Sequence, residues 1–206
     1  MPLTEIIYPE NGIIGLYKMT EEPWELEKKY LEIFQELPVP GSFQHDRRKR
    51  EWFGVRLLTA GLIGPDFSIL YSPMGVPQFV HPEFKYISIS HSAAYVAVYL
   101  HKSRKVGLDV ESLNRKFSVV EKKYLSEEEL EQVRENPLLR AVFWGVKEAV
   151  YKWAGKEGVD FRKQIRIQKI KPESINTIHA VLHTREEYPV QLNYLLFDGH
   201  VLVYTS

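Results

Sequence analysis

Hydrophobic positions in the first half of the chain follow helical spacing in two places and strand-like spacing in several others. After Thr20, apolar side chains recur about one helical turn apart and predict a helix that ends at Pro38: Trp24, Tyr30, Leu31, Phe34 and Leu37. A second helix is predicted over residues 46–63, because Gly64 and Pro65 follow it. Short apolar runs predict strands at residues 13–17, 67–71, 86–90 and 94–100, of which the last two form a hairpin.

The second half repeats this order of elements. An alternating strand is predicted at residues 106–111, and a helix follows whose start is marked by Ser126 and Glu129, the spacing of a capping box. A further helix is predicted from about residue 136 to residue 154, before four closing strands at residues 165–170, 178–183, 189–197 and 201–204. The chain is therefore predicted to be α+β, with similar halves at residues 1–102 and 103–206. Each half is expected to pack a small antiparallel sheet against helices, in a pseudo-twofold pair with a cleft at the seam.

Composition narrows the class of protein. The chain has 206 residues, 44% hydrophobic and 26% charged, which is ordinary for a globular protein. Its 27 basic and 27 acidic residues cancel, which argues against binding of nucleic acid by bulk charge. The absence of cysteine excludes disulfides, thiolate metal ligands and a cysteine nucleophile. No signal peptide starts the sequence and no apolar run reaches the ~20 residues of a membrane span, so a cytoplasmic protein with no membrane partner is expected.

Three carboxylates and one lysine are the first candidates for chemistry. Asp109 and Glu111 are two residues apart on a predicted strand, so their side chains project from the same face. Glu148 lies one helical turn before Lys152 in a segment rich in aromatic residues. A solvated strand face and a surface ion pair are the alternative explanations of these residues. If the carboxylates converge, they form an oxygen site suited to Mg²⁺, and Lys152 can neutralise a phosphate bound there.

A second group combines small polar residues with a basic run. Ser90 and His91 end a predicted strand, where hydroxyls and backbone amides can hold phosphate oxygens. Arg50 closes the basic run at residues 47–50; a structural histidine and a solvated helix start are the alternatives. The sequence has no Gly-x-Ser-x-Gly elbow and no glycine-rich phosphate loop, which disfavours a serine hydrolase and the common mononucleotide sites. The residues by themselves indicate a metal-assisted site for a phosphorylated ligand.

Three segments, taken in order, resemble motifs of the 4′-phosphopantetheinyl transferase superfamily. They are residues 88–92 (Ser-Ile-Ser-His-Ser), 106–111 (Val-Gly-Leu-Asp-Val-Glu) and 144–152 (Trp-Gly-Val-Lys-Glu-Ala-Val-Tyr-Lys). The resemblance is to the larger, two-half type that activates surfactin synthetase and similar assembly lines, with the active site at the seam of the halves. It implies transfer of the 4′-phosphopantetheine moiety of coenzyme A to a serine hydroxyl of an apo acyl or peptidyl carrier protein, with release of 3′,5′-ADP.

The resemblance also implies roles for the acidic residues and the lysine. The family's Mg²⁺ positions coincide with Asp109, Glu111 and Glu148, and its pyrophosphate-facing lysine coincides with Lys152. Glu148 is expected to accept the serine proton, directly or through a water. Glu129 lies near a further acidic position of the family and is the other candidate for the base.

The phosphates of coenzyme A are expected to meet residues of the first half. Ser90 and His91 fall on a phosphate-contacting pair of the family, and Arg50 falls on the arginine that contacts the 3′-phosphate. One departure from the family is Val76, which stands where the family has a lysine. The basic run at residues 47–50 is expected to supply the missing charge, with Arg50 as the direct contact.

Two other functions remain open at this point. A Mg²⁺-dependent phosphohydrolase of small nucleotides could use the same carboxylates to activate water. An RNA-binding module could use the basic run and the aromatic residues, although the zero net charge speaks against it. The two-half type of transferase is expected to work as a monomer and to bind no nucleic acid.

Overall fold

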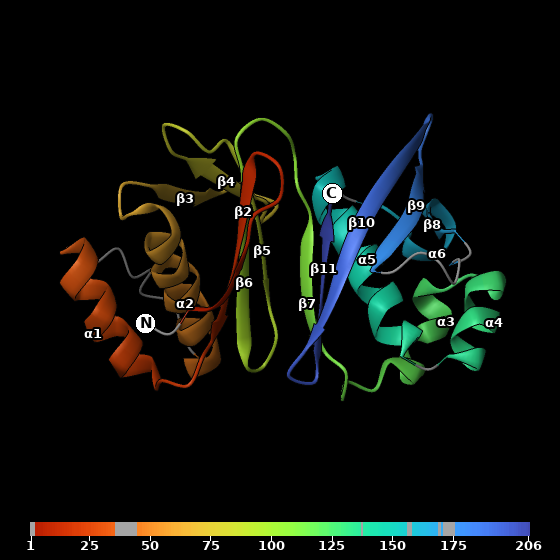
Figure 1. Ribbon diagram of the computed structural model, residues 1–206, viewed down its shortest axis with the longest axis horizontal. Helices are drawn as coiled ribbons and strands as arrows, with labels where there is room; N and C mark the ends of the chain where they lie inside the picture. The colour runs from red at the N-terminus through yellow and green to blue at the C-terminus, as the bar shows by residue number, and fades with distance from the viewer. Residues whose placement is uncertain (1–2, 36–44, 137, 156–157, 169, 171–175) are drawn as a thin grey trace. The chain divides into compact units, whose positions relative to one another are not determined.

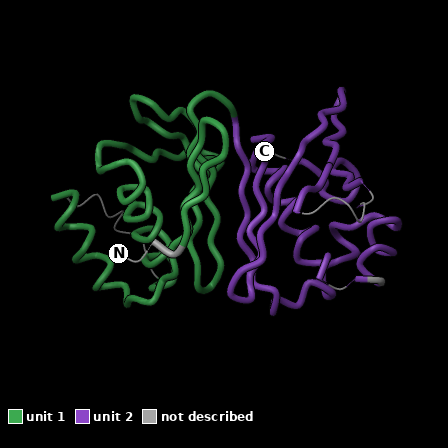
Figure 2. Tube along the Cα trace, in the orientation of Figure 1, with its two compact units in different colours: residues 1–104 green, residues 105–206 purple. Residues whose placement is uncertain are grey.

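The chain folds into two compact α+β units, Met1–Arg104 and Lys105–Ser206 (Figure 2). The structure is a computed structural model that describes residues 3–35, 45–136, 138–155, 158–168, 170 and 176–206. Both units combine antiparallel strands with helices, which confirms the predicted fold class; the pseudo-twofold relation stays a prediction. None of the helices described is long and apolar enough to cross a membrane.

Unit 1 is built on a four-stranded antiparallel sheet in the order β1-β2-β6-β5 (Figure 1). Its strands are β1 (Leu3–Ile7), β2 (Gly12–Lys18), β5 (Tyr86–His91) and β6 (Tyr95–His101). Every residue of β6 is buried, which matches its continuous apolar sequence. β5 and β6 pair as the predicted hairpin. A separate two-stranded sheet contains β3 (Ser68–Tyr71) and β4 (Pro77–Val80).

Two helices complete unit 1, α1 (Pro23–Phe34) and α2 (Asp46–Ile63). The buried core that α2 shares with the sheet includes Phe53, Leu57, Val96 and Val98. Gly15 of β2 lets α2 approach closely, because a Cβ at this position would lie 2.9 Å from Leu58 Cδ1. The predicted end of the first helix, at Leu37 and Pro38, lies outside the described residues.

Unit 2 contains a five-stranded antiparallel sheet in the order β7-β11-β10-β9-β8 (Figure 1). The strands are β7 (Leu108–Ser112), β8 (Ile165–Ile167), β9 (Thr177–His183), β10 (Glu187–Phe197) and β11 (His200–Thr205). The helical elements are η1 (Phe117–Val119), α3 (Glu121–Tyr124), α4 (Glu127–Glu135), α5 (Leu139–Ala154) and α6 (Phe161–Gln164). The predicted capping box is present at the start of α4, where Ser126 and Glu129 bond each other's backbone N–H.

Two glycines set how closely α5 lies on the sheet of unit 2. A Cβ on Gly145 of α5 would lie 2.6 Å from Val203 Cγ2 on β11. A Cβ on Gly107, directly before β7, would lie 1.9 Å from the carbonyl oxygen of Ala149. Both separations are far below van der Waals contact, so larger side chains would push the helix away from the strands.

Some short elements were absent from the sequence prediction. The strands β1 and β4 are edge strands, and β4 has no buried residue, so its hydrophobic pattern is weak. β4 also begins with Pro77, which reads as a break although proline is accepted at the first residue of a strand. The predicted strand at residues 165–170 was too long, because β8 ends at Ile167. The elements η1, α3 and α6 each have four residues or fewer, which is too short for a helical period to show.

Candidate functional site

The predicted acidic residues of unit 2 lie on β7 and α5. Asp109 is the second residue of β7 and only 4% exposed, while Glu111 lies two residues further along the strand. Glu148 is on α5, the helix that packs on this strand. The close approach allowed by Gly145 brings α5 to Asp109, since a Cβ on Gly145 would lie 3.8 Å from Asp109 Oδ2.

Lys152 joins the helix to the strand at this point. Its Nζ donates to Asp109 Oδ1 at 2.9 Å and to the carbonyl oxygen of Leu108 at 2.9 Å. Lys152 thus forms an ion pair with a buried carboxylate of the strand, whereas a surface ion pair within α5 would join it to Glu148. This contact excludes the interpretation of Lys152 as a purely solvated residue.

Glu111 contacts Trp144 and Arg115, and the sequence analysis did not select Arg115. Trp144 Nε1 of α5 donates to Glu111 Oε1 at 2.9 Å, and the guanidinium of Arg115 forms an ion pair with the same oxygen. Arg115 also lies over the Trp144 ring, with Cζ 4.5 Å from the centroid. Arg115 follows Glu111 by four residues but lies beyond the end of β7, so neither strand nor helix periodicity pointed to it.

The charge of Asp109 affects the pKa of the other two carboxyls of this site. Burial, followed by the charge of Asp109, raises the pKa of Glu111 to about 7, although Arg115 and Trp144 act in the opposite direction. Burial and then Asp109 also raise the pKa of Glu148, against Lys152 and Arg115. A positive charge placed at Glu111 and Glu148 would favour the ionised form of both carboxyls.

The donor set therefore fits Mg²⁺ in its chemistry, because all three side chains offer carboxylate oxygens and their charges repel. In the described part of the chain, however, no group of three or more His, Cys, Asp or Glu side chains is arranged to hold a metal ion. Lys152 and Arg115 instead lie against Asp109 and Glu111. The magnesium assignment to Asp109, Glu111 and Glu148 stays a prediction.

Glu129, the other candidate for a base, belongs to a sealed ion pair. Glu129 is 1% exposed, and Lys147 of α5, which is fully buried, donates to both carboxylate oxygens at 2.8 Å. The carboxylate also accepts the backbone N–H groups of Ser126 and Ile167, each at 2.8 Å. Because both oxygens are occupied and shielded from water, Glu129 is poorly placed to accept a proton from a substrate.

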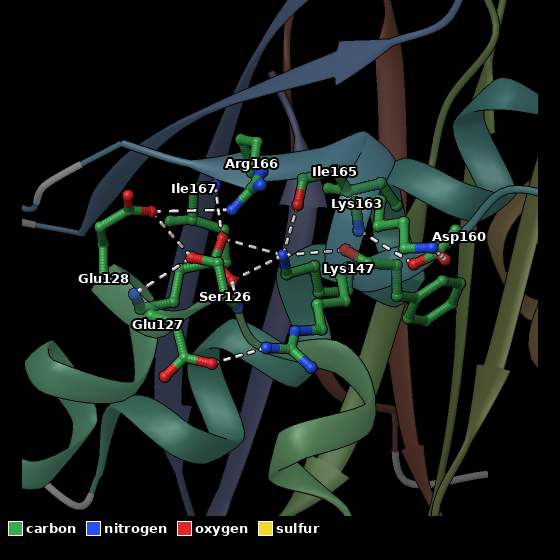
Figure 3. Close-up of polar contacts among 12 residues, drawn as sticks. Ser126, Glu127, Glu128, Lys147, Asp160, Lys163, Ile165, Arg166 and Ile167 are labelled. Atoms are coloured by element: carbon green, nitrogen blue, oxygen red, sulfur yellow. Dashed lines mark hydrogen bonds and ion pairs between the residues drawn. The ribbon is translucent and has the colours of Figure 1, made fainter.

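Lys147 ties four elements of unit 2 together (Figure 3). Besides Glu129 of α4, its Nζ donates to the carbonyl oxygen of Phe161 at 3.0 Å and to that of Ile165. Burial lowers the pKa of Lys147 to about 8, although Glu129 opposes this shift. Since Lys147 directly precedes Glu148, these bonds fix the rotation of α5 that also sets where Glu148 and Lys152 lie.

One phosphate candidate of unit 1, His91, lies beside a glutamate that the sequence analysis did not select. His91 Nδ1, at the end of β5, lies 3.1 Å from Glu51 Oε1 of α2. Glu51 also pairs with Arg47 Nε at 2.8 Å and with Arg48 Nη1 at 3.2 Å. The basic run and the strand-end histidine therefore share one carboxylate. Glu51 was missed because it follows four basic residues and reads as part of a solvated helix face.

The other predicted contacts of unit 1 lie in different surroundings. Ser90 is buried on β5, one residue before His91. Arg50 Nη2 donates to the carbonyl oxygen of Met19 at 2.7 Å, which ties its guanidinium to the end of β2. Val76 closes the turn between β3 and β4 through its backbone, whose N–H donates to Ser72 Oγ at 3.1 Å. The role of Val76 is thus that of a turn residue.

Unit 2 is, by its fold and its site, an α+β domain with strand and helix carboxylates beside a lysine. The model of the 4′-phosphopantetheinyl transferase superfamily matches residues 105–204, so this domain of the chain belongs to that superfamily. The match covers both β7 and α5, the elements that carry the acidic site. A search of curated proteins gave no match. Membership indicates phosphopantetheinyl transfer, with coenzyme A as donor and a carrier protein as acceptor, at the level of the superfamily.

Proposed function

We propose that this protein is a Mg²⁺-dependent 4′-phosphopantetheinyl transferase of the two-half type. It transfers the phosphopantetheine moiety of coenzyme A to a serine hydroxyl of an apo acyl or peptidyl carrier protein and releases 3′,5′-ADP. The observation that carries the proposal is the bond between Lys152 and buried Asp109, within a domain of this superfamily and beside two carboxyls of raised pKa. We further propose that it acts as a cytoplasmic monomer, without nucleic acid or membrane.

Three carboxylates would hold the metal, namely Asp109, Glu111 and Glu148. Bound Mg²⁺ would supply Lewis-acid stabilisation of charge on the pyrophosphate oxygens. Lys152 would add a second positive charge there, since its ammonium lies at Asp109. Arg50, Ser90 and His91 would contact the phosphates of coenzyme A.

The chain's own residues would then serve a displacement at phosphorus. The serine oxygen of the carrier protein attacks the β-phosphorus of coenzyme A, and the bond from that phosphorus to the bridging oxygen breaks. Glu148 accepts the serine proton, directly or through a water, and its raised pKa brings this carboxyl closer to the range where it can hold a proton near neutral pH. The leaving group is 3′,5′-ADP, whose new charge Lys152 offsets.

The test is intact mass spectrometry of several apo carrier proteins incubated with the protein, coenzyme A and Mg²⁺. The expected result is a carrier that gains one phosphopantetheinyl group. Asp109→Asn and Glu148→Gln should each lower the rate about 100-fold or more, because each removes a carboxylate that would hold the metal, and Glu148→Gln also removes the proposed base. Glu128→Gln, which changes an exposed glutamate of α4, is the matched control and should keep full activity.

Other outcomes would overturn the proposal in different ways. Release of 3′,5′-ADP from coenzyme A without added mass on any carrier would favour the phosphohydrolase. Retention of ordinary RNA in a gel shift, without carrier modification, would favour the binding module. Full activity of Asp109→Asn in saturating Mg²⁺ would remove Asp109 from the metal site.

A further inference from the structure

Glu51 is a buried carboxylate surrounded by cations that are not buried. The residue is 5% exposed, whereas the side chains of its partners Arg47 and Arg48 are 71% and 66% exposed. The third partner, His91, comes from β5, so the carboxylate joins a helix to a strand that is distant in sequence. Within this cluster the negative charge is inside and the positive charges reach the surface.

The charges of this cluster do not balance. The Glu51 carboxylate faces two guanidinium groups and, when His91 is protonated, one imidazolium. One carboxylate cancels one positive charge, so the cluster of Glu51 with its basic partners carries a net positive charge. Arg47 uses its Nε and Arg48 one Nη for the carboxylate, and each guanidinium has other N–H groups that can bond an anion.

This arrangement suits a phosphate monoester. Arginine forks match the oxygens of phosphate, and a cluster with excess positive charge matches a dianion. Arg50 differs from its neighbours, because its guanidinium is bonded to the carbonyl oxygen of Met19 rather than to Glu51. The side chains gathered by Glu51 are therefore Arg47, Arg48 and His91.

We propose that Glu51 is a positioning residue that holds Arg47, Arg48 and His91 together as the binding cluster for the 3′-phosphate of the nucleotide donor. This inference rests on the proposed function, which supplies coenzyme A as the ligand. It adds that the discrimination between donors with and without a 3′-phosphate depends on a residue that itself carries negative charge. Glu51 acts through the cations and does not touch the phosphate.

The sign of the Glu51→Gln effect separates positioning from simple electrostatics. Removing a negative charge near an anion site strengthens anion binding if the cations stay in place. If Glu51 positions the cations, the glutamine variant releases them and binding of the 3′-phosphate weakens. The expected change is about tenfold or more in the Kd for 3′,5′-ADP, the range of a lost charge-assisted contact. The Kd for 5′-AMP, which lacks the 3′-phosphate, should change by less than about twofold.

Isothermal titration calorimetry of the full chain with these two nucleotides measures both constants and needs neither transfer nor a carrier protein. Glu51→Asp keeps the charge but shortens the side chain, and it should lose less affinity for 3′,5′-ADP than Glu51→Gln. If Glu51→Gln fails to fold, Glu51→Asp decides, with a loss confined to the nucleotide that carries the 3′-phosphate. The double variant Glu51→Gln/His91→Gln should lose less affinity for 3′,5′-ADP than the two single losses add up to, because both residues act on one cluster.

Two matched controls lie in the same chain. Lys49→Gln removes a cation of the same basic run that forms no ion pair with Glu51 among the described contacts, and should weaken 3′,5′-ADP binding less than Arg47→Gln. Glu121→Gln breaks the half-buried pair with Arg140 in unit 2 and should leave the preference for 3′,5′-ADP over 5′-AMP unchanged.

The failure of this inference differs from the failure of the proposed function. If wild-type protein modifies a carrier but Glu51→Gln binds 3′,5′-ADP as tightly as wild type or more tightly, the positioning role is wrong. If wild-type protein modifies no carrier, yet Glu51→Gln selectively loses 3′,5′-ADP, the cluster binds a nucleotide 3′-phosphate and the transfer reaction is wrong.

Discussion

Two buried glutamates, Glu51 in unit 1 and Glu129 in unit 2, form ion pairs that differ in the number and the exposure of the cations. Among the residues that the structure describes, Glu129 forms an ion pair with one cation, Lys147, and both side chains are buried. Glu51 has three basic partners, and two of them are mostly exposed. The carboxylates are similarly buried, so the difference lies in the exposure and number of the cations.

This difference separates a structural ion pair from a cluster that is able to bind a ligand. The carboxylate of Glu129 and the ammonium of Lys147 bond each other and backbone groups of neighbouring elements, and both side chains are buried, which leaves them out of reach of a substrate. The cations at Glu51 keep N–H donors toward solvent. Burial of a charge therefore says little about its use until the accessibility of the partner is known.

Breaking the sealed pair should give the largest loss of stability. Lys147→Met removes the cation and leaves Glu129 charged and buried, which is expected to lower the free energy of unfolding by about 3–5 kcal/mol. Guanidinium denaturation followed by tryptophan fluorescence measures the change. The control Lys163→Met alters a mostly exposed lysine of α6 and should stay within about 0.5 kcal/mol of wild type. Equal stability of the two variants would show that the sealed pair contributes nothing.

Neutralising both partners should recover part of that loss. In Lys147→Met/Glu129→Gln the amide oxygen can still accept a backbone N–H from Ser126 or Ile167, and no charge remains buried. The double variant is expected to be more stable than Lys147→Met by about 1–3 kcal/mol, the usual size of coupling in a contacting pair. The same denaturation series checks this. Additive losses would mean that the two residues act independently.

Glu111 extends the comparison to a carboxyl whose buried neighbours are also acidic. Its pKa is raised from 4.5 to about 7, so between these values the folded chain binds the proton more tightly than the unfolded chain does. Without metal, stability should therefore fall as the pH rises from 5 to 8, and Glu111→Gln should lose most of this slope. Thermal unfolding in a chelator measures both.

Magnesium provides the complementary test of Glu111. Added Mg²⁺ should raise the unfolding temperature of wild type by a few °C more at pH 8 than at pH 6, because the ion competes with the proton for the same oxygens. Glu111→Gln should show a smaller and less pH-dependent gain. A metal-induced shift that is the same at both pH values would contradict the placement of Mg²⁺ at Glu111.

The smallest effect is expected at an ion pair in which both partners are exposed. Arg162 Nη2 lies 2.6 Å from Glu127 Oε1, the same separation range as in the buried pairs. Glu127→Gln should nevertheless cost about 0–1 kcal/mol, and less at high salt, because water screens the pair. Denaturation at low and high ionic strength checks this. A loss as large as that of Lys147→Met would show that distance, rather than exposure, sets the energy.

Much of unit 2 was predictable because its signals are local. The capping box at Ser126 and Glu129 marks the start of α4 within four residues. The spacing of Asp109 and Glu111 on a strand, and of Glu148 and Lys152 on a helix, also follows from repeat distances of single elements. The motifs built on these spacings led to the superfamily that the domain belongs to.

The partners of the charged residues could not be predicted in the same way. Lys147 and Glu148 are adjacent in the sequence, yet one is sealed with Glu129 and the other lies by the acidic site. Glu51 stands in a run that reads as a solvated helix face, and only the packing of α2 near the end of β5 places it beneath His91. Neither Lys147 nor Glu51 lies in a local sequence pattern that distinguishes its role.

The sequence by itself determined the α+β class, the hairpin of β5 and β6, and the residues of the acidic motif, because hydrophobic spacing and side-chain direction repeat within each element. The tertiary structure alone decided which carboxylate meets which cation and whether water reaches the pair. The reason is physical: the energy of a charge depends on its distance from other charges and on its exposure, and both are set by elements far apart in the chain.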